Sequence, residues 1–235
     1  MIAEQVQRIE EQEAFPVAEK YFLKTSGFDL TQTKFQKMMA SASETRERWL
    51  DGVNLQYVLQ FHEPDVFRDN ALLIGESKLP CNFFYQIPKE SVEGVYLYLI
   101  TAGKALFAPN QDIMEFLYAD IWGTSYVDAG TTILRERMEQ DMKQRFAGKE
   151  VKLSKEFGPG YYGMDGKYMK PLFSLLDGER IDVRINSSGF LIPQKSCAGL
   201  CLVLNDLDFD EGPECASCWG REGCEFCQIW LNRNA

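Results

Sequence analysis

A series of short strand-like segments followed by one long helical stretch constrains the fold more than any other feature of the sequence. Between residues 55 and 100 the apolar residues come in short runs, separated by Pro, Gly and acidic residues: LQYVLQF, NALLIG, NFFYQI and GVYLYLI. Runs of this length favour β-strands. In the long stretch 112–145 that follows, the second half, TTILRERMEQDMKQR, mixes apolar residues with opposite charges three and four positions apart. That pattern predicts a helix with an exposed face.

The remaining segments complete an α+β pattern. Helices are predicted over residues 4–23 and 31–50, and Thr31 can cap the second of them. After the long helix come a glycine-rich loop, FGPGYYGMDG, a short helix over 168–176 and three strand candidates, GERIDVRI, GFLIP and GLCLVL. We therefore expect an α+β fold with a twisted, mainly antiparallel sheet and flanking helices.

Composition and charge narrow the class of protein. With 235 residues, of which 45% are hydrophobic, the chain can form a sizeable core without disulfides. Its formal net charge of -10 argues against a nucleic-acid partner, because phosphate binding needs a basic face. The acidic N-terminus does not resemble a signal peptide, and the longest apolar stretches, such as residues 95–100, are too short to span a bilayer. We expect a cytoplasmic protein with no membrane partner.

Four of the seven cysteines lie close together near the C-terminus and predict a metal site. They form two CxxC pairs separated by five residues: Cys215, Cys218, Cys224 and Cys227. Four thiolates in a short polar segment suit tetrahedral zinc or a [4Fe–4S] cluster, and the spacing leaves both open. We therefore expect residues 1–205 to form one domain and residues 206–235 to form a C-terminal cysteine knuckle.

The other cysteines and the single histidine favour structural positions. Cys81, Cys197 and Cys201 stand in apolar, strand-like surroundings and are expected in the core. His62 precedes Glu-Pro-Asp and is expected in a turn. Lys195, which precedes a strand candidate, is expected either to line a cleft or to end a strand.

Four segments, in the same order along the chain, resemble the activation domain of cobalamin-dependent methionine synthase. They are YLYLITAGKAL, DIWGTSYVDA, GPGYYG and KPLFSLLDGERIDVRINSSGFLIPQKSCAG. Each motif alone is weak, but together they extend over roughly residues 90–205. The cysteine knuckle is absent from that family's module.

The resemblance implies a function in reactivating a cobalamin enzyme. Members of the family bind S-adenosylmethionine (AdoMet) and couple the reduction of inactive cob(II)alamin to methyl transfer from AdoMet. This chain has no Asp-x-His-x-x-Gly motif for binding cobalamin. It would therefore act in trans on a separate corrinoid-binding methyltransferase, which is methionine synthase or a related corrinoid protein. Flavodoxin or ferredoxin is the implied electron donor.

The resemblance also places an AdoMet site on a helix and a loop. The family's helical glutamate corresponds to Asp128. The family's Pro-Gly-Tyr loop corresponds to Pro159, Gly160 and Tyr161, and the loop position that hydrogen-bonds through its backbone corresponds to Gly158. At the position of the family's loop arginine this chain has Glu156, which cannot pair with the carboxylate of AdoMet. Lys155 or Lys152 would have to supply the cation.

Each of these assignments has an alternative. Asp128 fits a solvated carboxylate on a helix nearly as well, and the glycine-rich loop fits an ordinary surface turn. Glu156 is also compatible with a docking subunit that keeps the fold but has lost AdoMet. A third interpretation is an electron-transfer protein whose C-terminal Fe–S cluster reduces the corrinoid directly.

Overall fold

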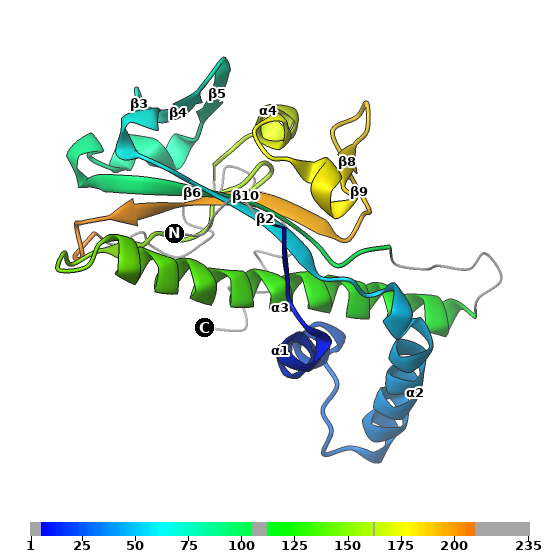
Figure 1. The fold of residues 1–235 in the computed structure, drawn as a ribbon. Helices are drawn as coiled ribbons and strands as arrows, with labels where there is room; N and C mark the ends of the chain where they lie inside the picture. Colours follow the sequence, from blue (N-terminus) through cyan, green and yellow to red (C-terminus); the bar gives the residue numbers. More distant parts are fainter. Residues whose placement is uncertain (1–5, 105–111, 162, 210–235) are drawn as a thin grey trace.

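A five-stranded antiparallel sheet forms the centre of the molecule (Figure 1). The computed structural model describes residues 6–104, 112–161 and 163–209. Within them the strand order is β1-β2-β6-β10-β7, and every neighbouring pair is antiparallel. The strands are Gln7–Arg8 (β1), Gln56–His62 (β2), Val92–Thr101 (β6), Ser196–Leu204 (β10) and Lys152–Leu153 (β7). The expected α+β class with a mainly antiparallel sheet is confirmed.

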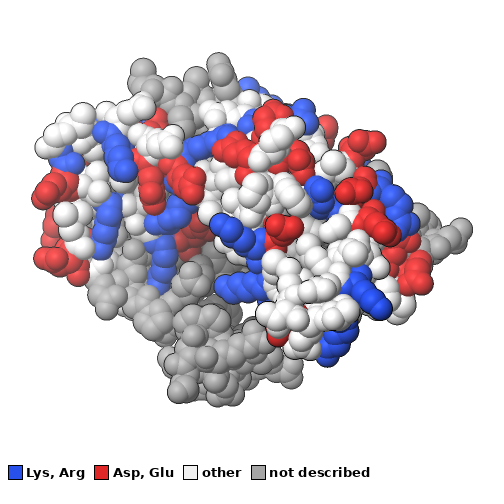
Figure 2. Space-filling view, turned by 90° about the horizontal axis from the view of Figure 1, so that it is seen from below, with Lys and Arg blue, Asp and Glu red and all other residues white. Residues whose placement is uncertain are grey.

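Helices cover one face of this sheet and small elements cover the other. The long helices are α1 (Glu11–Ser26), α2 (Thr33–Trp49) and α3 (Ile113–Arg145). Figure 1 shows α3 running beneath the sheet, with α1 and α2 on the far side of α3. The opposite face carries β3 (Phe67–Arg68), β4 (Ala71–Ile74), β5 (Ser77–Pro80), α4 (Met169–Ser174), β8 (Arg184–Ile185) and β9 (Leu191–Ile192). On the helical side, Figure 2 shows acidic and basic side chains interspersed.

The central strand β6 explains why both faces of the sheet are covered. Successive residues of a strand point to opposite faces. Tyr96, Tyr98 and Ile100 pack in the core between the sheet and the helices, whereas Val95, Leu97 and Leu99 pack in the core on the other face. All six are buried. The nearly continuous apolar run GVYLYLI therefore belongs to a strand that is buried on both faces and contributes side chains to both cores.

The strand prediction for NFFYQI is wrong. NFFYQI forms a 3-10 helix over Asn82–Gln86 (η3) and not a strand. Phe83 and Phe84 are both buried in the same core, where each ring packs against Phe157. In a strand these neighbours would face opposite sides, so burying both in one core favours a tight helical turn.

Helix starts and short strands also differ from the predictions. The first helix begins at Glu11, because Gln7–Arg8 pairs with β2. Thr31 does not cap the second helix, and its hydroxyl instead donates to the carboxylate of Asp29 at 2.7 Å. Most of GERIDVRI is not a strand, since Gly178–Ile181 forms a 3-10 helix (η6). The helices predicted over 31–50 and 112–145 are confirmed as α2 and α3.

In the part of the chain that the structure describes, no helix combines the length and apolar character needed to cross a bilayer. The predicted cysteine knuckle, with Cys215, Cys218, Cys224 and Cys227, lies outside the described residues.

Candidate functional site

Asp128 lies in the middle of α3, and its side chain is half-buried. Burial raises the pKa of this carboxyl, and the positive charges of Lys195 and Lys24 partly offset that effect. A carboxylate in this position is expensive to desolvate and gains from a cationic partner. The surroundings of Asp128 therefore suit an ammonium group better than those of a solvated surface residue would.

The glycine-rich loop continues from β7 along β10 before it turns. Phe157 and Leu200 exchange two backbone hydrogen bonds of 2.8 Å each. The turn follows at once, where the Tyr161 amide donates to the Gly158 carbonyl at 3.1 Å. Gly160 has a φ of 96°, a conformation that favours glycine. The loop is therefore tied to the sheet at one end and closed by a tight turn at the other.

Gly158 is needed because the ring of Tyr161 folds back over it. A Cβ atom at position 158 would stand 2.1 Å from the Tyr161 hydroxyl oxygen. The Tyr161 hydroxyl lies 3.5 Å from the Tyr98 hydroxyl and 4.0 Å from the sulfur of Cys197. The Tyr98 hydroxyl donates to a carboxylate oxygen of Glu156 at 3.3 Å. We call these four residues, Tyr98, Glu156, Tyr161 and Cys197, the tyrosine cluster.

Asp128 belongs to the same region as the tyrosine cluster. Burial raises the pKa of Cys197 to about 11, and the negative charges of Glu156 and Asp128 contribute to the rise. The pKa values of Tyr98 and Tyr161 are also raised well above the ordinary value, mainly by burial. At neutral pH these three groups therefore remain protonated. The structure thus brings the predicted helix residue and the predicted loop to one side of β10.

The lysines expected to replace the family's arginine point elsewhere. The ammonium of Lys155 lies 4.1 Å from the ring centroid of Phe83, which belongs to the core on the face away from α3. Lys152 donates to the carbonyls of Leu207 and Phe209 at 2.9 and 2.7 Å. Glu156 and not Lys155 therefore lies beside Tyr98.

Arg135 is a cation near the loop that sequence reasoning missed. It lies two helical turns after Asp128 on α3 and donates to the carbonyls of Ser154 and Leu153 at 2.9 and 3.3 Å. The charge pattern of the helix does not predict these partners. Only the folded structure, in which α3 lies next to β7, shows that Arg135 binds the loop backbone.

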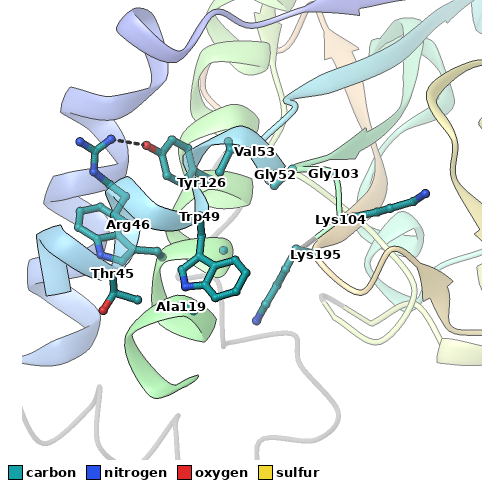
Figure 3. Close-up of a pocket in the computed structure, with 13 residues that line it drawn as sticks. Thr45, Arg46, Trp49, Gly52, Val53, Gly103, Lys104, Ala119, Tyr126 and Lys195 are labelled. Carbon is teal, nitrogen blue, oxygen red and sulfur yellow. Dashed lines mark hydrogen bonds between the residues drawn. The ribbon is translucent and has the colours of Figure 1, made fainter. Parts of the chain in front are cut away.

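A cavity between α2, α3 and the ends of β6 and β10 was also not predicted (Figure 3). Its volume is about 40 Å³, and its apolar wall includes Trp49, Val53 and Trp122. Lys195, which directly precedes β10, also lines it. We call it the α2–α3 cavity. Neither Asp128 nor the 156–161 loop contributes to its lining.

Lys195 lines the α2–α3 cavity, and its positive charge also acts on Asp128. Its ammonium is 2.7 Å from the carboxylate of Asp120 and donates to the Thr124 hydroxyl at 2.9 Å. The side chain runs over Gly123, where an added Cβ atom would stand 3.0 Å from Lys195 Cγ. A glycine on α3 therefore lets the lysine lie flat along the helix.

Among the described residues no three His, Cys, Asp or Glu side chains come together to hold a metal ion. Cys81 and Cys201 are buried and Cys197 is half-buried, as expected for cysteines in the core. The predicted ligands Cys215, Cys218, Cys224 and Cys227 lie outside the described residues, and their metal stays a prediction.

Comparison with known proteins finds a similar fold but no similar sequence. No protein-family model and no curated protein sequence matches the chain. A solved structure, the MetH reactivation domain bound to AdoHcy, matches it with a TM-score of 0.58 at 10% sequence identity. The match covers 89% of this chain and 81% of that chain. The chain has the fold of the MetH reactivation domain. At 10% identity the likeness is one of fold, and it extends over most of both chains.

Proposed function

We propose that this chain binds AdoMet and reactivates a separate cobalamin- or corrinoid-dependent methyltransferase. The observation that carries the proposal is the fold, which the chain shares with a domain solved with AdoHcy. AdoHcy is the product that AdoMet leaves after it has donated its methyl group. The order of the four family-like segments in the sequence supports the same conclusion independently.

The chain's own residues suit the recognition of AdoMet in three ways. Asp128 offers a half-buried carboxylate to the ammonium group. The 158–161 turn offers the backbone at Gly160, where an added Cβ atom would meet nothing within 4 Å and a ligand can therefore approach closely. Three side chains of the tyrosine cluster, Tyr98, Tyr161 and Cys197, stay protonated at neutral pH and add no negative charge to this region.

The partner would supply the corrinoid and a reduced protein would supply the electron. In such a reaction the cobalt accepts one electron, and the methyl group then moves from the sulfonium sulfur to the reduced cobalt, which leaves AdoHcy. In this proposal the chain itself binds AdoMet, orients the methyl group and docks against the partner.

Calorimetric titration with AdoMet tests the proposal. Asp128→Ala should weaken binding by about 1.5–3 kcal/mol, roughly 10- to 150-fold, which is the scale of a charge-assisted hydrogen bond. Asp177→Ala removes the same charge at an exposed position beyond α4 and should leave the affinity unchanged. If the parent chain does not bind AdoMet at millimolar concentration, the docking subunit is the better description.

The pH dependence of the same titration gives a second readout. An ammonium group binds the ionised form of Asp128. Burial raises the pKa of this carboxyl, so it becomes protonated at a higher pH than an ordinary aspartate does. When the pH is lowered, the affinity for AdoMet should therefore begin to fall at that higher pH. Asp128→Asn should remove this pH dependence. An unchanged profile in that variant would place the ammonium group elsewhere.

A further inference from the structure

The first turns of α3 expose a cluster of large apolar side chains, which make up half of the exposed large apolar side chains in the described part of the chain. They are Ile113 (80% exposed), Phe116 (47%), Leu117 (46%) and Met114 (40%). Single exposed apolar residues are ordinary on protein surfaces, but a contiguous group of them is typical of an interaction site. We call these four residues the α3 patch.

The α3 patch is exposed because the helix begins before the core does. The carboxylate of Asp112 caps the helix by accepting from the Met114 amide at 2.7 Å, and the first buried side chain of the helix is Tyr118. Figure 1 shows this end of α3 beside α2. Arg48 of α2 pairs with Glu115 at 2.6 Å. The start of the helix is therefore fixed in place while its apolar side chains stay in contact with solvent.

The α3 patch and Asp128 lie on the same side of α3. With 3.6 residues per turn, positions four or eleven apart share a side of a helix, and Ile113, Leu117 and Asp128 are spaced in this way. The rise from Leu117 to Asp128 is about 16 Å. A protein that covers a ligand at Asp128 therefore has to extend only a short distance along the helix to contact the patch.

The apolar surface also continues from the α3 patch to the α2–α3 cavity. Phe116 lies three residues before Ala119 and seven before Gly123, a spacing that places all three on one side of the helix. Ala119 and Gly123 line the cavity, and Trp49 forms part of its apolar wall (Figure 3). The patch therefore borders a small recess with apolar walls, as the central contacts of protein interfaces commonly do.

Area and charge argue against a second copy of the chain as the occupant of the α3 patch. Side chains of this size and exposure offer roughly 400 Å², so two facing patches would bury roughly 800 Å², less than the 1,200 Å² or so of a stable interface. Each copy also carries a formal net charge of -10, and like charges oppose association. A small apolar patch suits a short-lived contact with a different protein, and reactivation requires a partner that leaves again.

We propose that the corrinoid methyltransferase docks on the α3 patch when it is reactivated. This inference rests on the proposed function: the corrinoid must approach AdoMet beside Asp128, and the protein that carries it then lies along the same side of α3. The patch meets an apolar surface of the partner. Asp112 and the Arg48–Glu115 pair form part of the polar rim around this contact.

Binding of purified corrinoid proteins tests the docking surface. The corrinoid methyltransferases of the source organism, each loaded with cobalamin, are titrated one by one against the chain by biolayer interferometry. The double variant Ile113→Gln, Phe116→Gln should bind its partner at least about tenfold more weakly than the parent, because two apolar anchors are lost. Both residues are exposed, so the thermal unfolding transition should not change. Phe190→Gln is the matched control, because this ring is 70% exposed and directly precedes β9 on the opposite face of the sheet.

A photo-crosslinking residue, benzoylphenylalanine, in place of Leu117 identifies the occupant directly. A crosslink to the corrinoid protein supports the proposal. A crosslink between two copies or within one chain, or equal binding of the partner by parent and double variant, would overturn it and leave the proposed function standing. If none of the corrinoid proteins binds, the docking surface is refuted. The titration of the chain alone with AdoMet then decides separately whether it binds this ligand.

Discussion

At the scale of single residues, Glu156 is where this chain departs from the family that it resembles. The structure places its carboxylate beside the Tyr98 hydroxyl, on the same side of β10 as Asp128. Lys155, the neighbour expected to take an inner position, lies over the ring of Phe83 instead. The acid end of AdoMet would therefore meet a carboxylate where the family has a guanidinium.

This geometry predicts that Glu156→Arg tightens AdoMet binding. The substitution removes a repulsive charge and adds a planar, permanently charged group that pairs well with a carboxylate. We expect a gain of about 1–2 kcal/mol, roughly five- to thirtyfold, measured by calorimetric titration. Lys155→Ala should be neutral. A harmful Lys155→Ala together with a neutral Glu156→Arg would show that the loop exchanges these two side chains when it binds the ligand.

The sequence predicts some residues of this region and not others, for a physical reason. The turn at Gly158 and Gly160 is local, so two glycines in the FGPGYYGMDG segment suffice to predict it. The roles of Tyr98 and Cys197 depend on how β6 pairs with β10. That register joins segments about 100 residues apart, and no local pattern encodes it.

At the scale of elements, the long helix α3 was predictable and the shorter elements were less so. Opposite charges three and four positions apart are a property of the helix itself. NFFYQI, in contrast, takes its conformation from the core that receives Phe83 and Phe84. The two-residue strands β1 and β7 exist only because longer neighbouring strands pair with them.

Strand β10 contains a glycine whose replacement should destabilise the whole sheet. A Cβ atom on Gly199 would stand 2.5 Å from the Tyr98 hydroxyl and 2.8 Å from the Phe157 carbonyl oxygen. Since the Phe157 backbone is held by two hydrogen bonds to Leu200, it cannot move away easily. Gly199→Ala should lower the free energy of unfolding by about 1–3 kcal/mol in urea denaturation, the usual cost of overpacking. Gly166→Ala is the control, because a Cβ atom added there would meet nothing within 4 Å and the backbone φ is unstrained. Equal stability of the two variants would mean that β10 and the loop separate more readily than their contacts imply.

At the scale of the whole molecule, the order of the motifs indicated a fold that pairwise sequence comparison does not detect. The MetH reactivation domain shares only 10% identity with this chain, yet the two have the same fold. The α2–α3 cavity could not be predicted in this way. Its lining comes from four separate stretches of the chain, and their proximity is a result of folding.

The two cores, one on each face of the sheet, allow a prediction about the effect of metal removal on stability. The cores on both faces of the sheet are formed within the described residues, without the four clustered cysteines. We therefore expect metal removal by a chelator to leave the main thermal unfolding transition in place. This behaviour would differ from that of small zinc domains, which unfold without their metal.

Metal analysis of protein purified without oxygen should detect about one zinc ion or one [4Fe–4S] cluster per chain, as four thiolate ligands require. Cys218→Ser removes one ligand of the predicted set, Cys215, Cys218, Cys224 and Cys227, and should lower the metal content strongly. Cys197→Ser is the matched control, because this cysteine belongs to the tyrosine cluster and should not affect the metal. Visible absorption distinguishes the two metals, since a cluster absorbs in this range and zinc does not. An unchanged metal content in Cys218→Ser would show that the two CxxC pairs do not act together. A metal that disappears while the main unfolding transition persists would instead establish the C-terminal segment as a separate unit attached to a self-sufficient fold.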